Sequence, residues 1–295
     1  MIDYPAARAV QLVVQTGSFE RAAKALGVTP SAVSQRVRGL EDRLGVILID
    51  RGPPCAATDA GAWLCRHMEQ VGLLEGHLAK RFPQIRTQAE PVTLHIATNA
   101  DSLGTWFLPA VAAFVRESGC LIDIAVDDQD HTADWLRRGR VIAAVTALEK
   151  PVQGCQVKPL GRLRYHATAS PDFLRRHFPQ GVTAQALATA PALTFDQKDR
   201  LQQQWVRARF GHPLRFPTHW LPTPQGFVEA ALAGMGWGMN PAHLVRDHLA
   251  AGRLVELVPG SALDVGLFWQ TSHLAARSIA ALTRAVVEQA RATLD

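Results

Sequence analysis

Acidic side chains crowd into one segment of a chain whose formal net charge is +5. Residues 125–139 read AVDDQDHTADWLRRG and bring together Asp127, Asp128, Asp130 and Asp134. Carboxylates this close repel one another unless they are hydrated or paired with a cation. The segment is therefore either a solvated loop or a site for something positively charged. Asp134 lies further on, where a solvated charge or a partner for a helix N-terminus is the simpler interpretation.

Metal and thiol chemistry are the first alternatives for this segment and its surroundings. Asp127, Asp128, Asp130 and His131 offer ligands for a hard cation, but their spacing departs from the calcium-loop pattern. The four cysteines form no CxxC pair, which favours reduced thiols over a disulfide framework. Neither Cys120 nor Cys155 has an adjacent basic residue that would lower its pKa for a redox switch. We therefore expect no metal and no cofactor.

The elements around the acidic segment alternate between strands and helices. VTLHIAT, LIDIAV and VIAAVTA are predicted strands, separated by the helix TWFLPAVAAFVRESG and a short helix to Arg138. This βαβαβ pattern predicts a parallel sheet with helices on both sides. A second set spans residues 167–266, with strands near ALTF, GWGMN and RLVEL and helices RLQQQWVRARF and GFVEAALAG, and a final helix from about Ala275 returns to the first unit.

Three polar loops follow strands in this pattern: NADS, DDQD and FDQKD. Ligands of open α/β sheets bind beyond the carboxyl ends of the strands, so these loops are expected at one cleft. Each loop offers carboxylates, which favours a cationic ligand. Ser102 and the amides that open a helix at residues 103–105 could hold a carboxylate. A ligand with a carboxylate at one end and a cation at the other is a basic amino acid.

The first sixty residues predict three helices. Helical spacing of apolar residues, with Gly17 and Gly27 as stops, indicates the first two. A third begins at Thr29 and Pro30, because threonine caps free amides and proline loses no hydrogen bond there. Its buried stripe is predicted to be Val33, Val37, Leu40 and Leu44, and its opposite face is polar.

Two helices, a short turn and a third helix with a polar face make a helix-turn-helix. Such a face suits double-stranded DNA, because hydroxyls and a helix start bind phosphates while Gln and Arg reach base edges. A solvated helix face is the alternative. The predicted DNA contacts are Thr29, Pro30, Ser31, Ser34, Gln35 and Arg38.

The stretch GSFERAAKALGVTPSAVSQRVRGLEDRLGVILIDR resembles the winged helix-turn-helix of LysR-type transcriptional regulators. The GSF turn, the paired alanines, SAVSQ, LE and LG stand where that family has them. The usual Leu-Phe before the wing arginine is replaced by Leu48, Ile49 and Asp50. The resemblance implies that Arg51 contacts the minor groove or the DNA backbone.

A long helix is predicted from Thr58 to about Arg86, with an apolar stripe of Leu64, Met68, Val71, Leu74 and Leu78. Either this stripe packs on its own chain, or a second copy covers it. The resemblance implies the second arrangement, a homodimer that carries two DNA-binding heads, with a homotetramer beyond it.

The resemblance also implies the domain organisation. Residues 1–58 form the winged helix-turn-helix and residues 59–88 the linker helix. Residues 89–295 form an α/β effector-binding domain of the periplasmic-binding-protein type, with a ligand cleft between two lobes. Lobe I is expected at about 91–166 and 268–295, and lobe II at about 167–267.

NADSLGTWFLPA, FDQKDRLQ, TPQGFVEAALAGMGWGMNP and the DDQD region are similar to the ArgP/LysG branch of the same family, which responds to lysine and arginine and controls their export. Which acid meets the effector's cation, and whether the effector is lysine or arginine, stay open. The residues that the resemblance carries over as effector contacts are Asn99, Asp101, Ser102, Asp127, Asp128, Asp130, Asp196 and Gln225.

Other classes of protein fit the sequence less well. There is no GxSxG, HExxH, GxxxxGK[ST] or dinucleotide glycine pattern, so an enzyme is not expected. No export signal and no apolar run of about 18 residues is present, which favours a cytoplasmic protein without a membrane partner. The open alternatives are a nucleoid or replication-modulating DNA-binding protein, and a LysR-type regulator with a different small-molecule effector.

Overall fold

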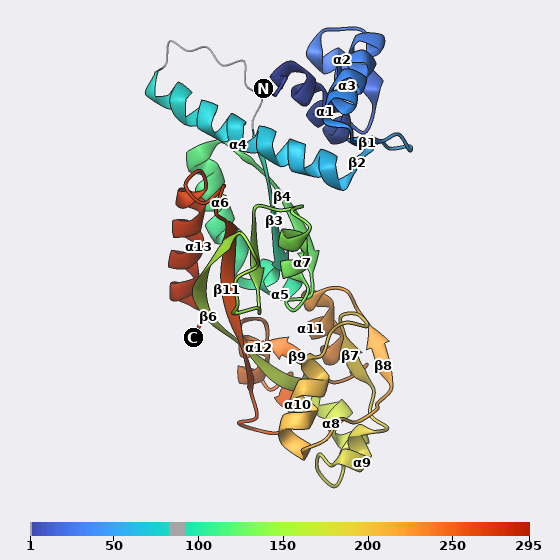
Figure 1. The fold of residues 1–295 in the computed structure, drawn as a ribbon. Helices are drawn as coiled ribbons and strands as arrows, with labels where there is room; N and C mark the ends of the chain where they lie inside the picture. The colour runs from blue at the N-terminus through green and yellow to red at the C-terminus, as the bar shows by residue number, and fades with distance from the viewer. Residues whose placement is uncertain (1, 83–91) are drawn as a thin grey trace.

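The computed structural model describes residues 2–82 and 92–295, which form a small helical domain, a long helix and a two-lobed α/β domain in succession (Figure 1). The helical domain holds α1 (Tyr4–Thr16), α2 (Phe19–Leu26) and α3 (Pro30–Leu44), followed by a wing of two antiparallel strands, β1 (Ile49–Asp50) and β2 (Ala56–Ala57). Within the described ranges no helix is long and apolar enough to cross a membrane.

Local signals place the ends of these three helices where the sequence predicts them. The Ser18 hydroxyl accepts a hydrogen bond from the Arg21 amide, and the Thr29 hydroxyl accepts one from the Ala32 amide. Gly17 follows α1 with a φ of 67°, a left-handed conformation that favours glycine. The predicted helix-turn-helix is confirmed.

The predicted buried stripe of α3 is wrong at one residue, Leu44. Val33, Val37 and Leu40 lie in the core with α1 and α2, whereas Leu44 is 50% exposed. Leu44 is the last residue of α3, and the core ends one turn earlier at Leu40. Helical periodicity identifies the face of a residue, but it does not say where the partner helices stop.

The linker helix α4 (Asp59–Arg81) begins as predicted, with the Thr58 hydroxyl accepting from the Gly61 amide. The helix ends at Arg81; the rest of the predicted range, residues 83–86, and the predicted turn near Pro91 lie outside the described residues. Leu64 and Met68 pack against the core of the helical domain.

Three large apolar side chains in or just after the second half of α4 are exposed. Leu74 is 60% exposed, and Leu78 and Phe82 are also exposed. The helix does touch the two-lobed domain through Glu69, whose carboxylate lies 3.1 Å from Nε2 of His95, while Nδ1 of His95 lies 2.8 Å from Asp123. Part of the predicted stripe therefore has no partner among the described residues.

Lobe I is built on three parallel strands in the order β5-β3-β4. They are β3 (Thr93–Asn99), β4 (Leu121–Asp127) and β5 (Ala143–Thr146). The helical connections are α5 (Ala100–Ser102), the wider turn η1 (Leu103–Phe107), α6 (Leu108–Ser118) and α7 (Thr132–Arg137). The last helix, α13 (Ala280–Thr293), packs beside α6, as the prediction of a returning final helix requires (Figure 1).

Two long strands that the sequence pattern did not predict cross both lobes. They are β6 (Cys155–Ala169) and β11 (Leu263–Ser272), which pair antiparallel. The sheet order is β10-β6-β11-β5-β3-β4, with β9 also on β6. The parallel pairing predicted for the βαβαβ segment is confirmed, and the antiparallel strands β6 and β11 extend these strands into a mixed sheet. Pro159 and Gly161 interrupt the alternation of β6, and the register shifts opposite them between Leu267 and Phe268.

Lobe II contains the remaining strands and helices. The strands are β7 (Ala192–Thr194), β8 (Thr218–Trp220), β9 (Gly238–Pro241) and β10 (Val255–Glu256). The helices are α8 (Pro171–His177), α9 (Ala184–Leu187), α10 (Leu201–Phe210), α11 (Pro224–Leu232) and α12 (Ala242–Ala250). The strands near ALTF, GWGMN and RLVEL and the two predicted helices are confirmed. Trp205 and Trp237 are core residues of this lobe.

Candidate functional site

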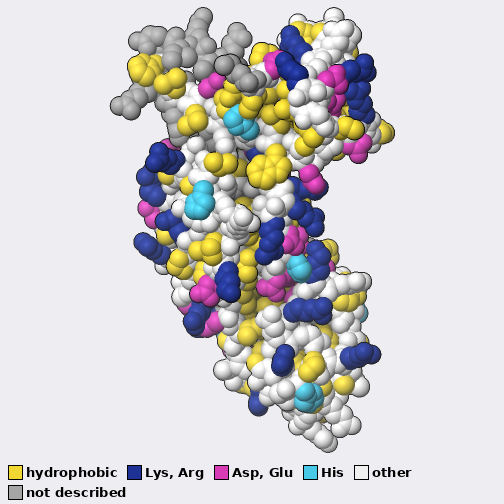
Figure 2. Space-filling model, in the orientation of Figure 1, with side chains coloured by type: hydrophobic (Ala, Val, Ile, Leu, Met, Phe, Trp, Pro, Cys, Tyr) yellow, Lys and Arg dark blue, Asp and Glu magenta, His cyan; other side chains and the backbone are white. Residues whose placement is uncertain are grey.

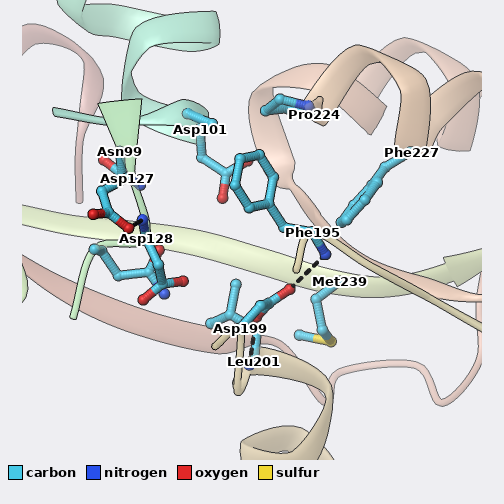
Figure 3. A pocket seen from close by; sticks show the side chains of 12 residues that line it. Asn99, Asp101, Asp127, Asp128, Phe195, Asp199, Leu201, Pro224, Phe227 and Met239 are labelled. Atoms are coloured by element: carbon cyan, nitrogen blue, oxygen red, sulfur yellow. Dashed lines mark hydrogen bonds between the residues drawn. The ribbon is translucent and has the colours of Figure 1, made fainter. Parts of the chain in front are cut away.

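A cavity opens where the carboxyl ends of β3, β4 and β7 meet, between the lobes (Figure 3). Lobe I contributes the ends of two parallel strands, and lobe II contributes the segment after β7, the start of α11 and β9. None of the described residues that line the cavity is Lys, Arg or His. The lining residues are Asn99, Ala100, Asp101, Asp127, Asp128, Gln129, Phe195, Asp199, Leu201, Pro224, Phe227 and Met239.

Asp101 is the most strongly perturbed carboxyl group of the cavity. Burial raises the pKa of Asp101 to about 7, and the nearby Asp199 and Asp128 act in the same direction. The Tyr165 hydroxyl donates a 2.8 Å hydrogen bond to Oδ2, which opposes the rise. Tyr165 is itself buried on β6, so its hydrogen bond ties the Asp101 side chain to that strand.

Asp128 and Asp199 add two carboxyl groups that are almost fully buried, whereas Asp101 is half-buried. Burial raises the pKa of Asp128 to about 6, and burial also raises the pKa of Asp199. The Asp130 amide donates to Asp128, and the Phe195 and Leu201 amides donate to Asp199. Figure 3 shows Asp101, Asp128 and Asp199 around one space. Three carboxyl groups that share a space from which water is partly excluded favour a cationic ligand.

Asp127 differs from these three groups because it already has donors. Burial acts to raise its pKa, but hydrogen bonds from Trp135 Nε1 at 3.1 Å, from the Asp128 amide and from Lys198 lower it overall. Nζ of Lys198 lies 3.3 Å from Oδ1 of Asp127. Asp127 is thus held as a carboxylate at the rim of the cavity.

Two polar side chains near the cavity have no hydrogen-bond partner among the described residues. The side-chain oxygen and nitrogen of Asn99 are both buried and unpaired, and so is the hydroxyl of Ser102. Buried polar groups are almost always paired, so unpaired ones beside a cavity indicate a site for water or a ligand. Phe195, Phe227 and Met239 supply an apolar wall for the same space.

The structure brings four of the eight sequence-predicted effector residues into the cavity lining: Asn99, Asp101, Asp127 and Asp128. The other four do not line it. Ser102 is buried one residue beyond Asp101, and Asp130 is exposed. Asp196 accepts hydrogen bonds from the Lys198 and Asp199 amides. Gln225 is exposed, and its amide lies against Gly104 of η1.

Sequence reasoning missed Asp199, Gln129, Tyr165 and the apolar wall. Asp199 belongs to the FDQKD loop that the sequence singled out, where Asp196 was chosen. Both carboxylates accept hydrogen bonds from backbone amides that follow them, so local turn chemistry does not distinguish Asp196 from Asp199. Tyr165 lies on β6, which the pattern did not predict. No group of three or more metal-ligating side chains is found among the residues that the structure describes.

The polar face of α3 is exposed as a DNA contact requires. Ser31, Gln35 and Arg38 are exposed and Ser34 is half-buried, while Thr29 and Pro30 open the helix. Figure 2 shows Lys and Arg side chains gathered on the outer side of the helical domain, away from α4. A positive surface of this kind attracts the phosphate backbone.

Arg51 follows β1 and is exposed. Its guanidinium lies 5.2 Å from the centre of the Phe19 ring and 3.8 Å from Oε2 of Glu41. The other oxygen of Glu41 accepts from the Leu48 and Ile49 amides, which fastens the wing to α3. The wing arginine and the polar face of α3 therefore belong to one rigid unit.

Two family models match the chain. Residues 6–62 match the bacterial regulatory helix-turn-helix of the lysR family, and residues 88–291 match the LysR substrate binding domain. Together these matches cover both the helical domain and the two-lobed domain.

Similar proteins point to one branch of this family. The regulator ArgP of Pseudomonas aeruginosa is 42% identical over 290 residues, 98% of this chain and 96% of that protein. The crystal structure of ArgP from Mycobacterium tuberculosis is 41% identical with a TM-score of 0.82, covering 100% of this chain and 99% of that one. LysG of Corynebacterium glutamicum, solved with bound effector Arg, is 35% identical with a TM-score of 0.72 and 99% coverage of each chain. The chain belongs to the LysR family of DNA-binding transcriptional regulators, in its ArgP/LysG branch.

Proposed function

We propose that this regulator senses arginine or lysine in the cavity between its lobes. The observation that carries the proposal is a set of three carboxyl groups around one cavity, the half-buried Asp101 and the buried Asp128 and Asp199, with no cation among the described lining residues. A cationic side chain would neutralise them, whereas a neutral or acidic effector would leave them unpaired. The LysG structure with bound Arg supports the same choice of ligand.

The rest of the cavity suits the remainder of a basic amino acid. The aliphatic part of the side chain would lie along Phe195 and Phe227. The unpaired amide of Asn99, with Ser102 behind it, would pair with the backbone carboxylate or ammonium of the ligand. We propose that Asp130 and Asp196 act indirectly. The backbone amide of Asp130 donates to the carboxylate of Asp128, and the carboxylate of Asp196 accepts from the amide of Asp199, so each stabilises the turn that carries a lining aspartate.

We further propose that the chain acts as a homodimer or a dimer of dimers and has no catalytic role. The exposed Leu74 and Leu78 of α4, with the exposed Phe82 directly after it, fit a helix that pairs with a second copy. Effector binding would favour one arrangement of the two DNA-binding heads over another. The regulated gene is proposed to encode an exporter of the same amino acid.

Calorimetric titration of the purified protein tests the effector proposal. Arginine and lysine are expected to bind, and citrulline, a neutral relative of arginine with similar shape, is expected to bind at least about tenfold more weakly, because it lacks the charge-assisted hydrogen bonds. Glutamate serves as the acidic control. Equal binding of arginine and citrulline would contradict a charge-selective site.

The DNA contacts are tested by comparing two substitutions on α3. Gln35→Ala is expected to reduce the preference for the operator over scrambled DNA by about 1 to 3 kcal/mol, because a base contact is lost. Ser31→Ala, which removes a proposed phosphate contact, should weaken binding to both DNAs alike. Fluorescence anisotropy with a footprinted operator measures both effects, and a uniform loss in Gln35→Ala would exclude base readout by that residue.

A further inference from the structure

An ion pair joins the two lobes at the rim of the cavity. Nζ of Lys198 lies 3.3 Å from Oδ1 of Asp127. Lys198 belongs to the lobe II segment between β7 and α10, and Asp127 is the last residue of β4 in lobe I. Asp127 lines the cavity, whereas Lys198 stands outside it with 53% of its side chain exposed. A cation of the chain itself therefore occupies one carboxylate of the proposed effector site.

The turn that carries Lys198 explains its position. Oδ1 of Asp196 accepts from the Lys198 amide at 2.6 Å and from the Asp199 amide at 3.0 Å. Asp199 is tied to the Phe195 and Leu201 amides and is only 7% exposed. With both aspartates held by backbone amides, Asp199 faces the cavity and Lys198 reaches across the gap between the lobes.

The carboxylate of Asp127 already accepts three hydrogen bonds. Oδ1 accepts from the Asp128 amide and from Lys198, and Oδ2 accepts from Trp135 Nε1. A carboxylate has about four acceptor positions, so a ligand guanidinium with two donors would have to displace one of these three. A backbone amide and an indole in a half-buried helix cannot leave, but an exposed lysine can return to water.

We propose that Lys198 is an internal competitor that the effector's cation displaces from Asp127, which makes Lys198 a determinant of effector affinity. This inference rests on the proposed function, because it requires a cationic effector in the cavity. Displacement opens the ion pair between the lobes, so the effector exchanges one link between the lobes for contacts of its own. Lys198 thereby sets how much arginine or lysine is needed for a response.

Lys198→Gln tests the inference, because glutamine cannot form the ion pair. The dissociation constant for arginine, measured by calorimetry at low ionic strength, is expected to fall about two- to fivefold, the range that corresponds to an exposed ion pair. The gain should shrink as salt is added, since salt screens exposed charges. Lys158→Gln, at an exposed lysine of β6 away from the cavity lining, is the matched control and should leave the constant unchanged.

A double-mutant cycle with Asp127→Asn locates the effect. In that background Lys198→Gln should change arginine affinity no further, because the competitor has lost its partner. If arginine binds the wild-type chain but Lys198→Gln binds it no more tightly, the inference is overturned and the proposed function stands. Weaker binding by Lys198→Gln would also overturn it and make Lys198 an effector contact. A wild-type chain that binds neither arginine nor lysine overturns the proposed function, and this inference with it.

Discussion

Asp101→Asn is expected to weaken arginine binding by about 10- to 100-fold while sparing binding to operator DNA. The substitution removes the charge and keeps the shape and an acceptor for the Tyr165 hydroxyl, which lies 2.8 Å from the carboxylate. A charge-assisted hydrogen bond to a partly buried group contributes about 1.5 to 3 kcal/mol, which corresponds to this range of affinity. Asp101 is on α5, which lies in lobe I away from α3 of the helical domain, so the DNA-binding face should keep its structure (Figure 1).

The measurement combines calorimetry with arginine and anisotropy with operator DNA in the absence of effector. Asp134→Asn is a matched control, because Asp134 is on α7, which follows the acidic loop in sequence, but is not among the lining residues. That control should bind arginine normally. Wild-type affinity in Asp101→Asn would remove Asp101 from the site, and a parallel loss of DNA binding would show that the substitution damages the fold.

Arginine affinity is expected to fall more than tenfold between pH 8 and pH 5.5. In the free protein the pKa of Asp101 is about 7 and that of Asp128 about 6, each raised mainly by burial. A bound cation favours the ionised form of each carboxyl group, so binding must release the protons that they hold. Affinity is therefore full above pH 7 to 8 and is lost as the pH falls through these two pKa values, at about tenfold per pH unit for each proton released.

Calorimetry at pH 6.5 in two buffers with different ionisation enthalpies counts the released protons. A net release is expected for the wild-type chain, and a smaller one for Asp101→Asn, which has one fewer group to deprotonate. Asp127 should contribute little, since hydrogen bonds from Trp135 and Lys198 keep its pKa low although burial acts to raise it. Affinity that stays constant from pH 5.5 to 8 would mean that the buried carboxyl groups do not meet the effector's cation.

Local sequence signals determined the DNA-binding domain and much of lobe I. Thr29 and Pro30 mark the start of α3, and Gly17 and Gly27 mark the ends of α1 and α2, because caps and left-handed glycines act within a few residues of themselves. The strands that end at Asn99 and Asp127 were also predicted from local pattern, as short apolar runs. Since parallel strands of one sheet end at one edge, the meeting of these two residues in a cleft followed from the order of the elements.

Contacts between distant segments decided the rest. The strands β6 and β11 pair over about a hundred residues of sequence, and β6 brings Tyr165 beneath Asp101. The sequence pattern named Asp130 and Asp196 together with Asp128 and missed Asp199, because all four are aspartates in loops after strands and the pattern does not distinguish them. Only the folded chain shows which carboxylates lose water and which accept hydrogen bonds from the turn or stay exposed. Desolvation depends on what every neighbouring segment covers, and no short stretch of sequence carries that information.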